Sequence, residues 1–272
     1  MLAAPLRTTS HSDARGAPAG AQPDQREGAL LGDARHEPIG ISFPKSGRTW
    51  VKAVLKRAGA PTPFTHAGHG SRKQELGRPF VAIPPDLAAR RVLFLHRNPI
   101  DTAVSFFHQV NSKDFAPGTL KYWQRLVPLW LEGRLPPRSI DAFVLHPNYG
   151  VEKICRFNRA WLDHLATRPD ALVVTYESLR ADPLPGFGRI LDWLGRDASG
   201  LAEAIEDKSF ENMRAREAAR AGDASTFLKP DRSRDAGAFK ARRGKVGGYA
   251  DELAPGTVAR ARDIAAAHGF EV

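Results

Sequence analysis

Short apolar runs alternate with amphipathic stretches along most of the chain beyond residue 38. The runs are bounded by charged or turn residues, which is the pattern of buried strands, and they lie at 39–43, 92–95 and 171–176. Apolar residues recur at helical spacing in the ranges 49–58, 99–110, 149–165, 186–195 and 199–219. This alternation predicts an α/β fold in which helices flank both faces of a central parallel sheet.

The first part of the chain differs from the rest. Residues 1–37 are rich in Ala, Gly, Pro and charge and show little hydrophobic periodicity, which is typical of a disordered or loosely attached arm. No internal repeat and no second linker of comparable length follows. We therefore expect one folded domain over residues 38–272.

The net charge of the chain says little about which molecules it binds. The 272 residues include 40 Lys and Arg against 30 Asp and Glu, a formal net charge of +10. This excess is either spread over a solvated surface or forms a field that attracts polyanionic small molecules or nucleic acid. No zinc-finger spacing or basic heptad region occurs, so we expect no nucleic-acid module.

The sequence carries no sign of membrane insertion or secretion. No apolar run approaches the length of a transmembrane helix, and the N-terminus lacks the apolar region of a signal peptide. Cys155 is the single cysteine, which excludes an internal disulfide and fits a reducing compartment. We expect a cytoplasmic protein in which Cys155 is a buried, inert thiol.

A polar loop follows the first predicted strand. Residues 44–50 read PKSGRTW and lead directly into a predicted helix. Unpaired N–H groups and the helix dipole make such a turn an anion site, to which Lys45 adds a charge and Gly47 a permissive backbone. The string GxxxxGK[ST] is absent, so this is not a Walker A loop.

A second strand–turn–helix unit has the same organisation. It reads LHRNPIDTAVSFFH over residues 95–108. Arg97 leaves the strand at its carboxyl end, where ligands bind in parallel sheets, and its planar fork suits a phosphate. Ser105 lies two turns into the helix and is placed to face the same anion. The alternative is a structural arginine that caps the helix, with an ordinary helix serine.

Together these segments resemble the 5′-phosphosulfate loop and the 3′-phosphate motif (RNP.D.AVS) of sulfotransferases that use 3′-phosphoadenosine 5′-phosphosulfate (PAPS). The resemblance implies a P-loop-like phosphosulfate-binding turn, PAPS as donor, 3′-phosphoadenosine 5′-phosphate (PAP) as product, and no required metal. It assigns the 5′ side of the nucleotide to Lys45, Ser46, Gly47, Arg48, Thr49 and Trp50. It assigns the 3′-phosphate to Arg97 and Ser105.

A third segment near the C-terminus is similar to the family's RKGxxGDW motif. The resemblance implies that Arg242, Arg243 and Gly244 also bind the 3′-phosphate. The chain departs from the motif at 248–250, where Gly-Tyr-Ala replaces Asp-Trp-Lys. How this segment packs, and whether it contributes to a homodimer, is left open by the sequence. Taken alone, the segment would be a flexible basic loop.

The resemblance also points to an adenine pocket. Trp50, Phe210 within an SF..M string, and Tyr176 match family residues that stack on the base or bond to its edge. Base stacking on an aromatic ring contributes about 1–3 kcal/mol. The alternative for each of these residues is core packing.

Transfer of a sulfuryl group requires a base for the acceptor's proton and a cation at the leaving phosphate oxygen. Lys45 is placed for the second role. The family's base lies in a TH segment, which implies His66 here, with His69 as its rival. The family form is KTH, but residue 64 is Phe, so a second cation is either missing or comes from Arg48 or Lys73.

The sequence therefore predicts a sulfotransferase that moves a sulfuryl group from PAPS to a hydroxyl or amine. Two alternatives remain: a nucleotide kinase of related P-loop fold, and a non-catalytic protein that binds PAP or another polyanion. No His/Cys/Asp cluster has the spacing of metal ligands. The resemblance implies an acceptor pocket built from variable loops, expected here at 67–88, 111–148 and 220–240, so the identity of the acceptor is left open. The aromatic residues of these loops either suit a small-molecule, lipid or glycan acceptor or belong to the core. Aromatic residues in or beside the loops are Phe115, Tyr122, Trp123, Trp130, Phe143 and Tyr149.

Overall fold

The structure is a computed structural model. It describes residues 37–67, 69, 76–114, 120–209, 212 and 245–272, all of which belong to one unit, residues 35–272. The boundary between an N-terminal arm and a domain at residue 38 stays a prediction.

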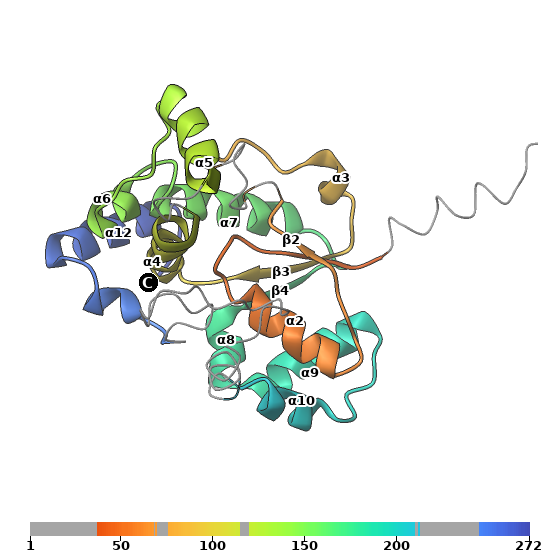
Figure 1. The fold of residues 1–272 in the computed structure, drawn as a ribbon. Coiled ribbons are helices and arrows are strands. Elements are labelled where there is room, and N and C mark those ends of the chain that lie inside the picture. The colour runs from red at the N-terminus through yellow and green to blue at the C-terminus, as the bar shows by residue number, and fades with distance from the viewer. Residues whose placement is uncertain (1–36, 68, 70–75, 115–119, 210–211, 213–244) are drawn as a thin grey trace, which may run out of the picture. The chain divides into compact units, whose positions relative to one another are not determined.

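The centre of the fold is a four-stranded sheet in the order β2-β1-β3-β4 (Figure 1). Its strands are β1 (Ile39–Ile41), β2 (Phe64–Thr65), β3 (Val92–His96) and β4 (Leu172–Thr175). All neighbouring strands are parallel, with Ile41 opposite Phe94 and Phe94 opposite Val173. Their carboxyl ends therefore meet at one edge, which confirms the predicted parallel α/β architecture.

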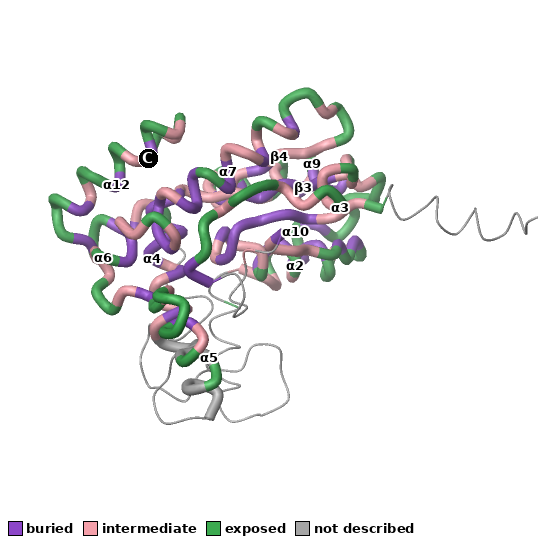
Figure 2. The backbone as a smooth tube through the Cα atoms, turned by 90° about the horizontal axis from the view of Figure 1, so that it is seen from above, coloured by how far each residue is buried: buried purple, intermediate pink, exposed green. Residues whose placement is uncertain are grey.

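Helices cover both faces of this sheet (Figure 1). On one face lie α2 (Arg48–Arg57), α8 (Tyr176–Ala181), α9 (Pro183–Leu194) and α10 (Leu201–Asp207). On the other lie α4 (Pro99–His108), α6 (Ile140–Leu145), α7 (Val151–Leu165) and α12 (Pro255–Ala267). Successive side chains of β3 alternate between the two cores, because strand residues point to opposite faces in turn. In Figure 2 most of β3 is coloured as buried, whereas β2 and most of β4 are intermediate.

Several elements differ from the prediction. Strand β2 was not predicted, because two residues give no periodic signal. The helix expected at 199–219 ends at Asp207. Tyr176 begins α8 and does not end a strand, because the Thr175 side chain accepts a hydrogen bond from the Ser178 N–H and caps the helix.

The segment expected to be a variable loop at 111–148 contains regular structure. It holds most of the π-helix η1 (Gln109–Asp114), then α5 (Leu120–Leu131) and α6. Phe143 and Tyr149, considered for the acceptor pocket, are fully buried in the core, whereas Trp130 is exposed. The remaining elements are α3 (Pro85–Ala88) and the 3-10 turn η3 (Gly248–Asp251). None of the described helices has the length and apolar character needed to span a membrane.

Candidate active site

The PKSGRTW loop connects β1 to the start of α2, as predicted. Lys45 and Gly47 both have positive φ, +73° and +94°, so the chain turns sharply and Gly47 becomes the N-cap of α2. The buried Ser46 hydroxyl has no hydrogen-bond partner among the described residues, while Thr49 is exposed. Because no acidic residue lies in the first turn of α2, the positive end of the helix dipole is left for an anion.

Tyr176 packs directly against this loop. A Cβ atom on Gly47 would lie 2.4 Å from Tyr176 Cδ2, a distance that only glycine avoids. Trp50 meets the Tyr176 ring edge-on at 6.0 Å and the Phe187 ring at 5.2 Å between centroids. Both Trp50 and Tyr176 are buried in the core, and the Trp50 Nε1 atom has no partner among the described residues. Their contact with adenine stays a prediction.

Arg97, which directly follows β3, also contacts Tyr176. Its guanidinium carbon lies 4.6 Å from the centroid of the Tyr176 ring. Its Nη2 atom lies 3.3 Å from Asp101 Oδ2 and donates to the Lys245 carbonyl oxygen at 3.2 Å. The buried Nε atom has no partner in the described part of the chain. Tyr176 thus links the two predicted phosphate-binding turns, since it contacts both Gly47 and Arg97.

Ser105 is four residues beyond Asp101 in α4, so the two residues share one face of the helix. The helix begins as predicted, with Pro99 in its first turn. Its start is fixed by Asn98, whose side chain accepts hydrogen bonds from the N–H groups of Ile100 and Asp101 at 2.9 and 3.2 Å. Asn98 is therefore a positioning residue for the second motif.

Asp101 is the functional candidate that sequence reasoning missed. Its carboxylate is 3% exposed and accepts hydrogen bonds from the N–H groups of Gly247 and Tyr249 at 2.9 and 3.1 Å. Asp101 is the D of the RNP.D.AVS string, but it was given no role of its own, because an acid in the first turn of a helix is ordinary. Four predicted nucleotide-binding residues, and the alternative cation, lie outside the described residues: Phe210, Arg242, Arg243, Gly244 and Lys73.

His66 directly follows β2 and contacts the backbone of Ser42, the residue after β1. Its Nδ1 atom lies 2.8 Å from the Ser42 carbonyl oxygen. A carbonyl oxygen only accepts, so Nδ1 carries the hydrogen and the lone pair is on Nε2. Burial and the nearby Arg48 charge lower the pKa of His66 to about 4, against the opposing effect of the Ser42 hydrogen bond. His66 is therefore neutral at pH 7 and able to accept a proton.

His69 has a different environment. Its ring packs against Phe80 and Phe157, with centroids 5.0 and 5.4 Å away, and its buried Nδ1 atom has no described partner. Burial lowers its pKa to about 4, assisted by the charges of Lys153 and His66. His69 is thus half-buried among aromatic rings, whereas the Nδ1 atom of His66 is bound to the Ser42 carbonyl oxygen. The choice of His66 over His69 as the base stays a prediction.

Arg48 is the described candidate for the second cation. It is the first residue of α2, and burial lowers the pKa of its guanidinium. The positive charge of Arg48 is one of the causes that lower the pKa of His66, so the two side chains are near enough to interact electrostatically. Phe64 packs over β1, since a Cβ atom on Gly40 would lie 2.4 Å from its ring. The position that is lysine in the family motif therefore serves packing in this chain.

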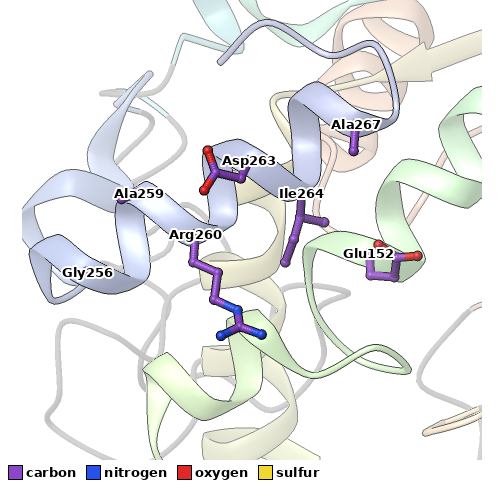
Figure 3. Close-up of a pocket in the computed structure, with 7 residues that line it drawn as sticks. All are labelled: Glu152, Gly256, Ala259, Arg260, Asp263, Ile264 and Ala267. Atoms are coloured by element: carbon purple, nitrogen blue, oxygen red, sulfur yellow. The ribbon is translucent and has the colours of Figure 1, made fainter.

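Three further features lie away from the two phosphate motifs: Cys155, the groups that could bind a metal, and a surface hollow. Cys155 is fully buried, and burial raises the pKa of its thiol to about 12. No group of three or more His, Cys, Asp or Glu residues is arranged to hold a metal ion within the described ranges. A surface hollow between α12 and Glu152 of α7, drawn in Figure 3, contains no residue of the phosphate motifs.

The family model of the sulfotransferase domain matches residues 78–268, well over half of the chain. The chain therefore belongs to the sulfotransferase family, a family of transferases, as its motifs predicted. The matched range includes Arg97, Ser105 and Tyr176 but begins after the PKSGRTW loop and His66.

Relatives and solved structures agree with this assignment. The chain is 24% identical to gorilla sulfotransferase 6B1 over 72% of its own length and 68% of the relative. It is 22% identical to cytosolic sulfotransferase 17 of Arabidopsis thaliana, covering 80% and 70%. The fold matches mouse sulfotransferase SULT7A1 complexed with PAP, with a TM-score of 0.55, 18% identity, and 89% and 88% coverage. Retinol dehydratase in complex with androsterone and the inactive cofactor PAP matches with a TM-score of 0.54 at 15% identity, covering 87% and 81%.

Proposed function

We propose that this protein transfers a sulfuryl group from PAPS to a hydroxyl or amine of a small-molecule, lipid or glycan acceptor and releases PAP. The observation that carries the proposal is the position of Tyr176, between the Gly47 turn and the Arg97 guanidinium. Two anion sites on neighbouring parallel strands suit a nucleotide that carries a phosphosulfate and a separate phosphate. The PAP complex of SULT7A1 and the cytosolic plant relative support PAP binding and a cytoplasmic location.

The residues present fit such a nucleotide. Ser46 Oγ and Arg97 Nε are both buried polar atoms without described partners, one in each turn. A buried polar atom without a hydrogen-bond partner lowers the stability of the folded protein. A phosphate oxygen would provide the missing hydrogen bond for each of these two atoms. The positive φ of Gly47 lets the backbone amides approach an oxyanion.

The proposed chemistry gives each of these groups one role. PAPS supplies the electrophilic sulfur when it is bound. His66 Nε2 takes the acceptor's proton while the acceptor's bond to sulfur forms. The bond between sulfur and the phosphate oxygen breaks, and its electron pair stays on that oxygen. Lys45 and the loop amides stabilise the charge that develops there, and Arg48 provides the second cation.

Calorimetric titration tests the nucleotide assignment directly. PAP and AMP differ only in the 3′-phosphate, and ADP carries the same number of phosphates in another arrangement. Each charge-assisted hydrogen bond to a phosphate contributes about 1.5–3 kcal/mol, so PAP should bind at least about tenfold more tightly than either control. Arg97→Ala should remove this preference.

Arg91→Ala is the matched control, because Arg91 precedes the same strand and also lies on an aromatic ring, 4.3 Å from Trp193. This variant should keep the preference for PAP even if it is less stable. Equal binding of PAP, ADP and AMP to the wild-type protein would overturn the proposal. Sulfate transfer from labelled PAPS in the presence of a magnesium chelator then separates an enzyme from a nucleotide kinase or a silent PAP-binding protein.

A further inference from the structure

Asp101 joins the second phosphate motif to a segment near the C-terminus. We call residues Lys245–Asp251 the C-terminal turn. The Asp101 carboxylate accepts hydrogen bonds from two N–H groups of this turn, through Oδ2 from Gly247 at 2.9 Å and through Oδ1 from Tyr249 at 3.1 Å. Asp101 Oδ2 also lies 3.3 Å from Arg97 Nη2. One carboxylate thus holds both the turn and the predicted phosphate-binding arginine.

This arrangement uses both carboxylate oxygens of Asp101 as acceptors. At 3% exposure a carboxylate is stable only if it is paired and hydrogen-bonded, and here a guanidinium and two amides meet that need. Asparagine has the same shape but presents one NH₂ group. That group would face a backbone N–H, donor against donor, on one side of the contact.

The C-terminal turn has other anchors, but they do not reach Arg97. Tyr249 is 4% exposed, and its hydroxyl accepts a hydrogen bond from Arg262 Nη2 at 3.2 Å. Lys245 Nζ lies 2.7 Å from Asp251 Oδ2 within the turn itself. These contacts stabilise the turn, whereas Asp101 and the Lys245 carbonyl connect it to the guanidinium.

Arg97 is consequently held on three sides before any ligand binds. Its Nη2 atom is shared between Asp101 and the Lys245 carbonyl oxygen, and its plane lies over Tyr176. The Nε atom is the buried donor that remains without a described partner. A guanidinium fixed in this way loses little side-chain freedom when an anion arrives, which raises its affinity for that anion.

We propose that Asp101 is a positioning residue that couples docking of the C-terminal turn to recognition of the 3′-phosphate at Arg97. The proposal rests on the proposed function, since it concerns the same phosphate. Docking of the turn orients Arg97, and a phosphate bound by Arg97 stabilises the docked turn in return, because coupling between two equilibria is reciprocal.

The test compares PAP with AMP in Asp101→Asn. This variant should lose about tenfold in PAP affinity, the equivalent of one charge-assisted contact, and stay within about twofold for AMP. A residue that only stabilised the fold would weaken both nucleotides together. Tyr249→Phe is the matched control, since it removes the bond to Arg262 but keeps the N–H that Asp101 holds, and it should leave the ratio of the two affinities unchanged.

Hydrogen exchange provides a second measurement on the wild-type protein if Asp101→Asn does not fold. PAP should slow exchange of the Gly247 and Tyr249 amides more than a saturating amount of AMP does. Equal slowing by the two nucleotides, or unchanged or increased PAP affinity in Asp101→Asn, would overturn the coupling. Equal affinity of the wild-type protein for PAP and AMP would instead mean that the proposed function itself fails.

Discussion

Gly47 and Tyr176 are in contact although 129 positions separate them in the chain (176 − 47), and the space between them excludes a side chain. The contact orients the turn that begins α2 against the residue that begins α8. It also places the Tyr176 ring between this turn and Arg97. The shape of the candidate site therefore depends on one glycine.

Gly47→Ala should destabilise the protein and abolish nucleotide binding. Its Cβ would meet the Tyr176 ring at 2.4 Å, and the φ of +94° is strained for alanine. Gly59→Ala is a matched control, because Gly59 also has a positive φ, +74°, but nothing lies within 4 Å of its added Cβ. The control should lose about 1–2 kcal/mol in unfolding free energy and retain PAP binding. Urea unfolding and calorimetry measure the two effects, and equal losses in both variants would contradict the role of the contact.

His66→Ala should lower kcat by about 10²–10⁴-fold, the usual contribution of a general base, with little change in PAP affinity. The reason is that the His66 Nδ1 atom is bound to the Ser42 carbonyl oxygen, which leaves the lone pair on Nε2 to accept the acceptor's proton. His69→Phe retains an aromatic ring between Phe80 and Phe157 and should keep kcat within a few-fold. Single-turnover transfer of labelled sulfate distinguishes them. The assignment of the base would be wrong if His69→Phe lost activity and His66→Ala kept it.

Arg48→Gln should raise the pKa of His66, because the positive charge of Arg48 is one of the causes that lower it. Burial is the larger cause and remains, so the pKa should rise from about 4 without returning to 6.5. Titration of the histidine rings by NMR measures the change. His96 is an internal control, since burial alone lowers its pKa to about 4 and the substitution should leave it there. An unchanged pKa of His66 in this variant would mean that the Arg48 charge does not act on the predicted base.

Much of the site was predictable because its signals are local. In both PKSGRTW and RNPIDTAVS a polar turn directly follows an apolar strand and directly precedes the first residues of a helix. The structure has these two turns after the carboxyl ends of β1 and β3. The Asp101 contacts were not predictable, because their partners lie near the C-terminus in a segment that departs from the family motif. Strand β2 gave no signal because pairing with β1, and not its two-residue sequence, makes it a strand.

Stability should fall steeply with acid between pH 6.5 and 4. His66, His69 and His96 each have a pKa lowered to about 4 by burial, against 6.5 in the unfolded chain. In this range the unfolded state binds protons that the folded state does not, so unfolding becomes more favourable as pH falls. One such histidine contributes at most about 1.4 kcal/mol per pH unit.

His96→Gln should reduce this acid sensitivity by up to that amount per pH unit. The residue stacks on Phe94, with ring centroids 5.6 Å apart, so the substitution also costs some packing, but that loss does not vary with pH. Urea unfolding of both proteins from pH 7.5 down to 4.5 separates the two effects, because above pH 7 the histidine is neutral in both states. Parallel curves for the two proteins would show that His96 is not the buried, neutral group that its position indicates.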